Sequence, residues 1–194
     1  MIMLAISHHT VQEHHNSKNS RDATMNDKTE RKLIWKDWVG GTITGLLFIG
    51  EIIVCILCFN WLRLLWLNIT GWILIGIAFF VLGGLARVAF SKYGQVPEKE
   101  SWLNTTRVVD RGIYSVVRHP IYLSWYFYFL GFICLSQHWI TVMLALPAFV
   151  LVYLDTIKEE KSSIKRFGDA YKEYMQRVPR LNILLGILRI MRSH

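Results

Sequence analysis

The chain has 194 residues, 53% of them hydrophobic and 19% charged, with a mean hydropathy of +0.30. Residues 119–154 contain no Asp, Glu, Lys or Arg, and a 36-residue run of this kind cannot face water. Length and composition therefore exclude an ordinary soluble domain and predict an all-α integral membrane protein of one domain. The net charge of +8 indicates a surface beside anionic lipid, because nucleic-acid binding is a poor explanation at this hydropathy.

Residues 1–36 are polar and mixed in charge, and we interpret them as a solvated N-terminal tail. The apolar opening is too short for the core of a signal peptide, so we expect no cleaved export sequence. A solvated tail also explains its paired histidines better than a metal site does. Cys55, Cys58 and Cys134 lie within apolar runs and lack further ligands, so we expect no bound metal.

Two apolar runs within residues 37–91 predict two spanning helices. Hydrocarbon about 30 Å thick needs about 20 helical residues, which fits residues 39–62 and 69–90. The first of these spans contains Glu51. An ionisable residue inside a span is functional by default, although Glu51 can instead pair with a polar partner such as Arg87.

The charge-free run is too long for one span, because as a single helix it measures about 54 Å. The triplet Ser-Gln-His at 136–138 holds its only consecutive polar residues and marks a turn. The sequence therefore predicts a helical hairpin over 121–154, with arms 121–135 and 139–154. This hairpin belongs to a predicted catalytic region, residues 92–194.

Positive charge favours four crossings, with both termini and the middle loop on the cytoplasmic side. Of 22 Lys and Arg, six precede the first span, six lie between positions 87 and 118, and nine follow position 154. Only Arg63 lies between the first two spans, and the hairpin turn has none. Residues 181–191 leave open a fifth, short membrane helix, so we expect four to five membrane helices and a cytoplasmic C-terminal cofactor-binding subdomain.

Beyond the hairpin, apolar residues recur at helical intervals and predict an amphipathic helix at the cytoplasmic surface. Gly168 interrupts this helix at a cost of about 1 kcal/mol relative to Ala, and Pro179 should end it. Its apolar face consists of Ile157, Ile164, Phe167, Tyr171, Tyr174 and Val178.

The topology brings three motifs to one face: Gly112-Ile113-Tyr114, Arg118-His119-Pro120-Ile121-Tyr122 and Glu159-Glu160. A hairpin returns the chain to the side that it left, so the Glu pair should lie near His119. Pro120 suits the first position of a helix, and the backbone N–H groups at that helix end favour an anionic group. The Glu pair can hold an ammonium. These residues predict a pocket at the lipid boundary that matches both charges of an amino-acid moiety.

Two further motifs follow, Phe-Gly-x2-Tyr-x2-Tyr at 167–174 and Val-Pro-Arg at 178–180. With them, residues 85–182 resemble the isoprenylcysteine carboxyl methyltransferase family, and the match is close to an archaeal or bacterial member. The resemblance implies a membrane methyltransferase that uses S-adenosyl-L-methionine. Its acceptor would be a lipid or a lipidated small molecule or peptide entering from the bilayer, with the methyl group going to the carboxylate of a prenylated cysteine or an analogue. By motif, the implied cofactor ligands are Arg107, Val108, Val109, Tyr114, His119, Pro120, Ile121, Tyr122 and Glu159. The implied catalytic residues are Glu159, Glu160 and His119; helical spacing favours Glu160 for the pocket, whereas the resemblance favours Glu159.

One position departs from the family pattern. Eukaryotic members resemble this chain around the Glu pair but have a substrate-facing arginine four residues before it, where this chain has Asp155. An acidic side chain repels a substrate carboxylate, so either Arg118 or Arg180 supplies the positive charge, or the acceptor is an amine, as in related phospholipid N-methyltransferases. Two further classes of protein also stay open: an NADPH-dependent membrane sterol or steroid reductase, and a non-enzymatic scaffold or transporter.

Overall fold

The computed structural model describes residues 39–94 and 107–193. The chain divides into two compact units, residues 1–42 and residues 43–194. Of the first unit only residues 39–42 are described, and they begin a helix. The predicted polar tail, residues 1–36, therefore lies outside the described residues.

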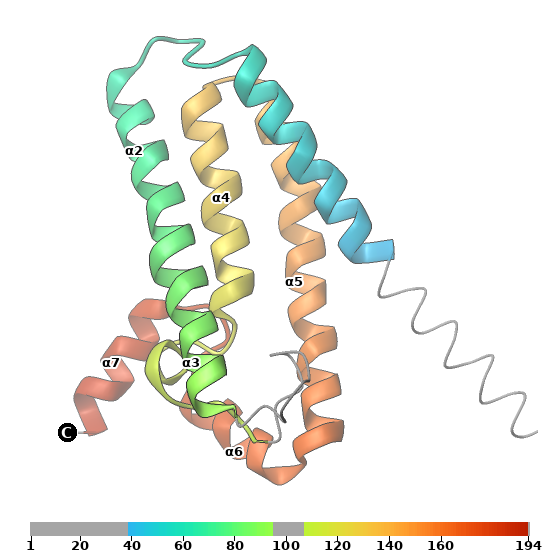
Figure 1. Cartoon of the computed structure of the whole chain (residues 1–194), viewed down its shortest axis with the longest axis vertical. Helices are drawn as coiled ribbons and strands as arrows, with labels where there is room; N and C mark the ends of the chain where they lie inside the picture. The colour runs from blue at the N-terminus through green and yellow to red at the C-terminus, as the bar shows by residue number, and fades with distance from the viewer. Residues whose placement is uncertain (1–38, 95–106, 194) are drawn as a thin grey trace, which may run out of the picture. The chain divides into compact units, whose positions relative to one another are not determined.

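Three helices are long and apolar enough to cross a membrane: Val39–Leu57, Leu65–Tyr93 and α5 (Trp139–Phe167). A fourth apolar helix, α4 (Pro120–Ser136), is shorter and lies between the second and third of these (Figure 1). Large apolar side chains on the spans are exposed, as expected where hydrocarbon replaces water. The part of the chain that the structure describes contains helices and no strand, so the prediction of an all-α integral membrane protein is confirmed.

The second long helix consists of α2 (Leu65–Gly76), a π-helical segment (Ile77–Gly84) and α3 (Leu85–Tyr93). It packs most extensively against α4, where Gly71 and Gly131 bring the two backbones together. A Cβ atom on Gly71 would lie 2.8 Å from the carbonyl oxygen of Gly131. Small residues at such a crossing allow a close helix–helix approach in a membrane.

Helices α4 and α5 form a hairpin, with the turn at the predicted polar triplet. Gln137 ends α4 in the left-handed conformation, with a φ of 55°. Its side-chain amide donates to Asn60 Oδ1 (3.0 Å) and to the Leu64 carbonyl (2.9 Å), and its Oε1 accepts from the Leu64 N–H (3.0 Å). Because the His138 side chain accepts from the Ile140 N–H, it caps the start of α5. The polar triplet thus closes the hairpin and ties it to the turn after the first helix.

The second arm does not end near residue 154, where the loss of hydropathy predicted its end. No glycine or proline separates it from the first part of the predicted amphipathic helix, so α5 continues unbroken to Phe167. The break falls at Gly168, which has a φ of 59°, and α6 (Asp169–Arg177) follows it. Helix α6 ends two residues before Pro179.

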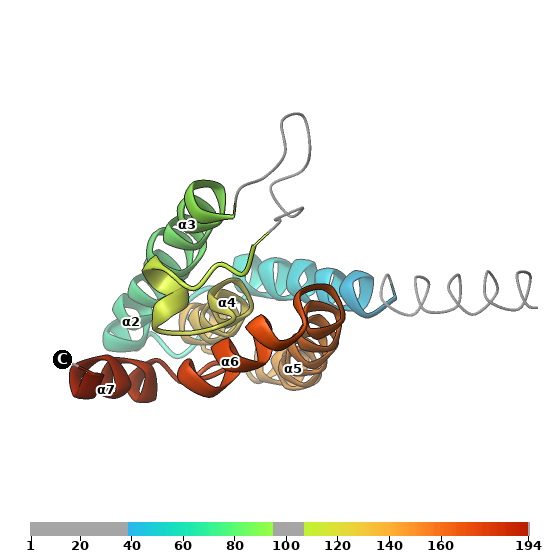
Figure 2. The same ribbon diagram turned by 90° about the horizontal axis from the view of Figure 1, so that it is seen from below.

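The last helix, α7 (Ile183–Ser193), begins two residues later and ends two residues later than the predicted segment 181–191. Eleven residues reach about 16 Å, which is too short to cross hydrocarbon. Gly186 packs so closely on the chain before α4 that an added Cβ would meet the Val116 backbone. Figure 2 shows α6 and α7 in succession at the end of the molecule where α4 begins.

Candidate active site

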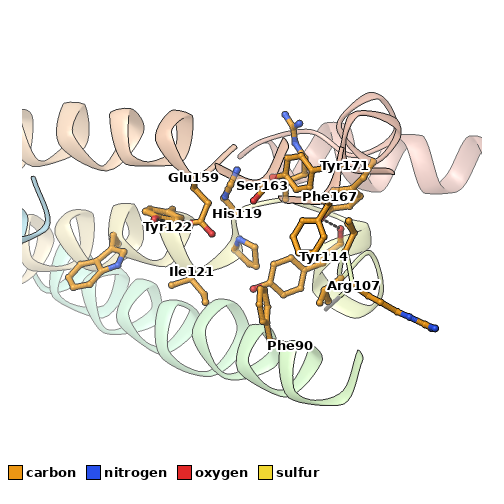
Figure 3. Close-up of a pocket in the computed structure, with 16 residues that line it drawn as sticks. Phe90, Arg107, Tyr114, His119, Ile121, Tyr122, Glu159, Ser163, Phe167 and Tyr171 are labelled. Carbon is orange, nitrogen blue, oxygen red and sulfur yellow. Dashed lines mark hydrogen bonds between the residues drawn. The ribbon is translucent and has the colours of Figure 1, made fainter. Parts of the chain in front are cut away.

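A cavity of about 270 Å³ lies where α4 begins and the outer part of α5 ends. Aromatic side chains form much of its wall, and Figure 3 shows them arranged around His119 and Glu159. The cavity is lined by Phe90, Arg107, Val108, Val109, Tyr114, Arg118, His119, Pro120, Ile121, Tyr122, Trp125, Glu159, Ser163, Phe167, Tyr171 and Tyr174.

Backbone hydrogen bonds fix the segment that enters α4. The Arg118 N–H donates to the Pro179 carbonyl (3.0 Å), and the His119 N–H donates to the Arg180 carbonyl (3.2 Å). Pro120 occupies the first turn of α4, and its fixed φ suits a helix start. His119 is the N-cap residue, yet its side chain does not cap the helix. The imidazole is therefore available for contacts across the hairpin.

Those contacts converge on Glu160, whose carboxylate is the centre of a buried charged cluster. Its Oε1 lies 3.3 Å from His119 Nε2, 3.1 Å from Arg118 Nη2 and 3.0 Å from Arg180 Nε. The Arg180 Nη2 atom donates to the other carboxylate oxygen. Glu160 is 3% exposed, so these charges interact with little screening by water. The hydrogen bond to Glu160 is also the largest cause of the raised pKa of Arg180.

Glu159 lies on the adjacent face of α5 and takes a different environment. It is exposed, it lines the cavity, and its Oε2 accepts a 2.9 Å hydrogen bond from the Tyr122 hydroxyl. The Tyr122 ring also meets the His119 ring edge to face, with 5.6 Å between centroids. One turn of α4 thus orients both the imidazole and a carboxylate at the cavity.

Helix α6 closes the cavity opposite α4. The buried Tyr174 hydroxyl donates to the Tyr114 carbonyl (2.7 Å), which links α6 to the 3₁₀ turn Gly112–Ser115. Burial raises the pKa of both Tyr114 and Tyr174, and it raises the pKa of Tyr171 to about 12. All three phenols are therefore neutral near pH 7 and act as hydrogen-bonding groups without charge.

The structure brings together all nine residues that the motifs implied as cofactor ligands, since each of them lines this one cavity. Glu160 is absent from the lining. Asp155 is absent too, and its carboxylate lies 2.8 Å from Lys158 Nζ. Phe90 and Trp125 also line the cavity; no sequence pattern marked them, because in apolar helices they look like any lipid-facing aromatic.

Glu51 does not belong to this site. It is fully buried within the helix Val39–Leu57, and neither of its carboxylate oxygens has a hydrogen-bond partner among the described residues. The pairing with Arg87 considered from the sequence is therefore wrong. Arg87 is exposed on α3, because the residues facing the interior there are the small Ala86 and Ala89.

Fold and site together define a polytopic, all-helical membrane protein with a cavity built at the open end of a helical hairpin. Within that class the chain belongs to the family described as proteins of unknown function (DUF1295), whose model matches residues 46–178. No solved structure matches it significantly.

Curated relatives add a second similarity. The chain is 30% identical over 118 residues to the protein-S-isoprenylcysteine O-methyltransferase of Homo sapiens and 29% identical over 126 residues to that of Mus musculus. Each match covers 60% of this chain and 41% of the relative, so the chain matches less than half the length of these proteins. The resemblance to isoprenylcysteine carboxyl methyltransferases inferred from the motifs is confirmed.

Proposed function

We propose that the protein is an S-adenosyl-L-methionine-dependent methyltransferase that acts in the membrane on a lipid-borne acceptor, the carboxylate of a prenylated cysteine or an analogue. One observation carries the proposal: the residues implied by motif as cofactor ligands, which lie on four separate segments of the sequence, line a single cavity. The relatives' name, protein-S-isoprenylcysteine O-methyltransferase, supports the reaction class.

The side chains of the cavity fit a zwitterionic, sulfonium-bearing donor. Glu159 offers a carboxylate to an ammonium, and the N-terminus of α4 offers its positive end to a carboxylate. Aromatic faces attract organic cations such as a sulfonium. Trp125, Phe167 and Tyr171 supply such faces here.

The bound donor would supply an activated methyl group on a sulfonium. In-line transfer of that methyl group to an acceptor oxygen would form a C–O bond and break the C–S bond, whose electron pair would stay on sulfur. An ionised carboxylate needs no base, so the work of this chain is to align the two reactants and keep water away. His119 and Glu159, held by Glu160 and Tyr122, are the proposed orienting groups.

An acceptor that arrives laterally suits the place of the cavity. Its walls include the first turns of α4 and the outer turns of α5, both continuous with apolar helices. We assign the cavity and both termini to the cytoplasmic side, because the Lys and Arg residues gather there in the predicted topology.

The proposal is tested by isothermal titration of the detergent-purified full chain with S-adenosylhomocysteine. We expect binding by the wild type and strongly weakened binding by the double variant His119→Ala, Glu159→Ala. Absence of binding by the wild type, or unchanged binding by the double variant, would refute it. Binding of NADPH in place of S-adenosylhomocysteine would select a reductase instead.

The acceptor is then identified with labelled methyl donor and two panels, prenylcysteine analogues and aminophospholipids. We expect methyl transfer to the prenylcysteine carboxylate. Asp155, the side chain that favoured an amine acceptor, does not line the cavity and pairs with Lys158, so its charge opposes a carboxylate less than the sequence suggested. Transfer to the aminophospholipids alone would reverse this assignment.

A further inference from the structure

Two arginines flank Glu160, and only Arg118 has guanidinium nitrogen atoms without a hydrogen-bond partner in the described part of the chain. Arg180 uses Nε and Nη2 on Glu160 and Nη1 on the Tyr153 hydroxyl (2.9 Å). Arg118 contacts Glu160 through Nη2, whereas its Nε and Nη1 atoms are buried and have no hydrogen-bond partner in the described part of the chain. Arg118 also lines the cavity, which Arg180 does not. The two guanidinium groups therefore have different capacities for a ligand.

Leaving the Arg118 donors unmet is costly. The Arg118 side chain is 8% exposed, so bulk water does not replace the missing acceptors. A buried donor without a partner costs a free energy comparable to a lost hydrogen bond, and more when the group is charged. The single carboxylate of Glu160 also faces two guanidinium groups, so this buried cluster has an excess of positive charge. Both features call for an anionic acceptor at this place.

We propose that Arg118 binds the carboxylate of the ligand that occupies the cavity. The inference rests on the proposed function for the ligand's identity, because the methyl donor and a prenylcysteine acceptor each carry one carboxylate. Glu160 acts as the positioning residue that holds the guanidinium in place through Nη2. Arg118 thereby supplies the positive charge that Asp155 cannot.

A carboxylate fits better than a phosphate. Glu159 lines the same cavity, so a dianion there would meet a negative charge, whereas an amino-acid moiety offers its ammonium to Glu159 and its carboxylate to Arg118. The N-terminus of α4 adds a partial positive charge of about half an elementary charge beside Arg118, which does not balance the second charge of a dianion. Arg118 and Glu159 together therefore suit an amino-acid moiety, whereas a ligand with a carboxylate and no ammonium would use Arg118 alone.

The test compares ligands that differ only in the carboxylate. The first pair is S-adenosylhomocysteine and its decarboxylated analogue; the second is N-acetyl-S-farnesylcysteine and its methyl ester. Titration of the full chain in detergent gives a preference ratio for each pair in the wild type, Arg118→Lys and Arg118→Gln. Arg111→Gln is the control, because Arg111 is an exposed arginine near Arg118 in the chain that does not line the cavity. Since each ratio is taken within one protein, a partly unfolded variant does not distort it.

We expect the wild type to prefer the acid in one pair by roughly 10- to 100-fold, the range for a hydrogen bond to a charged group. Both Arg118 variants should reduce that ratio to below about threefold, whereas Arg111→Gln should retain it. If the preference for the acid is lost in the first pair, Arg118 binds the carboxylate of the methyl donor. If it is lost in the second pair, Arg118 binds the carboxylate of the acceptor.

Ratios that stay unchanged in both Arg118 variants, or that fall equally in Arg111→Gln, would overturn the inference. The wild type could bind neither adenosyl ligand and still prefer the farnesyl acid over its ester in a way that depends on Arg118. That result would refute the proposed methyl donor but support the carboxylate site. A wild type that binds none of the four ligands would end both proposals.

Discussion

Substitution of each of the two adjacent glutamates by glutamine should have a different effect, on protein stability for Glu160 and on ligand binding for Glu159. Glu160→Gln removes the negative charge from a carboxylate that is 3% exposed and contacts Arg118, His119 and Arg180. Removing one partner of a buried ion pair costs about 3–5 kcal/mol, since the other charge stays buried. At about 2–4 °C per kcal/mol for a chain of this size, we expect the unfolding temperature to fall by roughly 6–20 °C.

Glu159→Gln is the matched control. Glu159 is exposed and its hydrogen bond is to the neutral Tyr122 hydroxyl, so we expect a stability change within about 0.5 kcal/mol. Its loss should instead appear as weaker binding of S-adenosylhomocysteine. Thermal unfolding in detergent and isothermal titration measure the two effects separately. Equal falls in unfolding temperature for both variants, or a Glu160→Gln protein as stable as the wild type, would refute the inference that Glu160 stabilises the fold and Glu159 contacts the ligand.

Three further changes test the surroundings of the cavity. Tyr174→Phe leaves the buried Tyr114 carbonyl without its 2.7 Å donor and should cost about 1–3 kcal/mol in the free energy of unfolding, measured by denaturant titration; no change would mean that the hydrogen bond is not formed. Burial raises the pKa of Tyr171 from 10.0 to about 12, so its contribution to stability is complete below pH 10 and is lost as the pH rises through 12. The unfolding temperature of Tyr171→Phe should therefore fall less steeply over this interval than that of the wild type, and parallel curves would contradict this. Gly186→Ala places a Cβ against the Val116 backbone, and overpacking of this kind should destabilise the docked α7 by about 1–3 kcal/mol, seen as faster amide exchange in α7. Unchanged exchange would show that α7 adjusts freely.

The hairpin was predictable because two independent signals coincide in it. A charge-free run that is too long for one span must fold back, and the triplet at 136–138 holds the only consecutive polar residues within it. The end of the second arm was not predictable from hydropathy. Polarity increases near Asp155, but a helix does not end where its surroundings become polar, and α5 ends only at Gly168. Backbone chemistry, not hydropathy, sets that boundary.

The cavity was only partly predictable, since spacing and resemblance pointed to different glutamates. Helical spacing put Glu160 on one stripe of α5 with Ile164 and Phe167 and favoured it for the pocket; Phe167 does line the cavity, but Glu160 is buried against Arg118, His119 and Arg180 and does not. The partners of Glu160 come from segments far apart in the sequence, so no local sequence pattern predicts these contacts.

The unbroken α5 has a consequence for where the reaction takes place. Its 29 residues measure about 43 Å, whereas the hydrocarbon is about 30 Å thick, so roughly the last nine residues extend beyond it. Glu159 is the first of these nine. The number of residues between Trp139 and Glu159 therefore sets the position of the Glu159 carboxylate relative to the hydrocarbon boundary. Deleting one residue from that interval would lower the carboxylate by about 1.5 Å and turn it by about 100°.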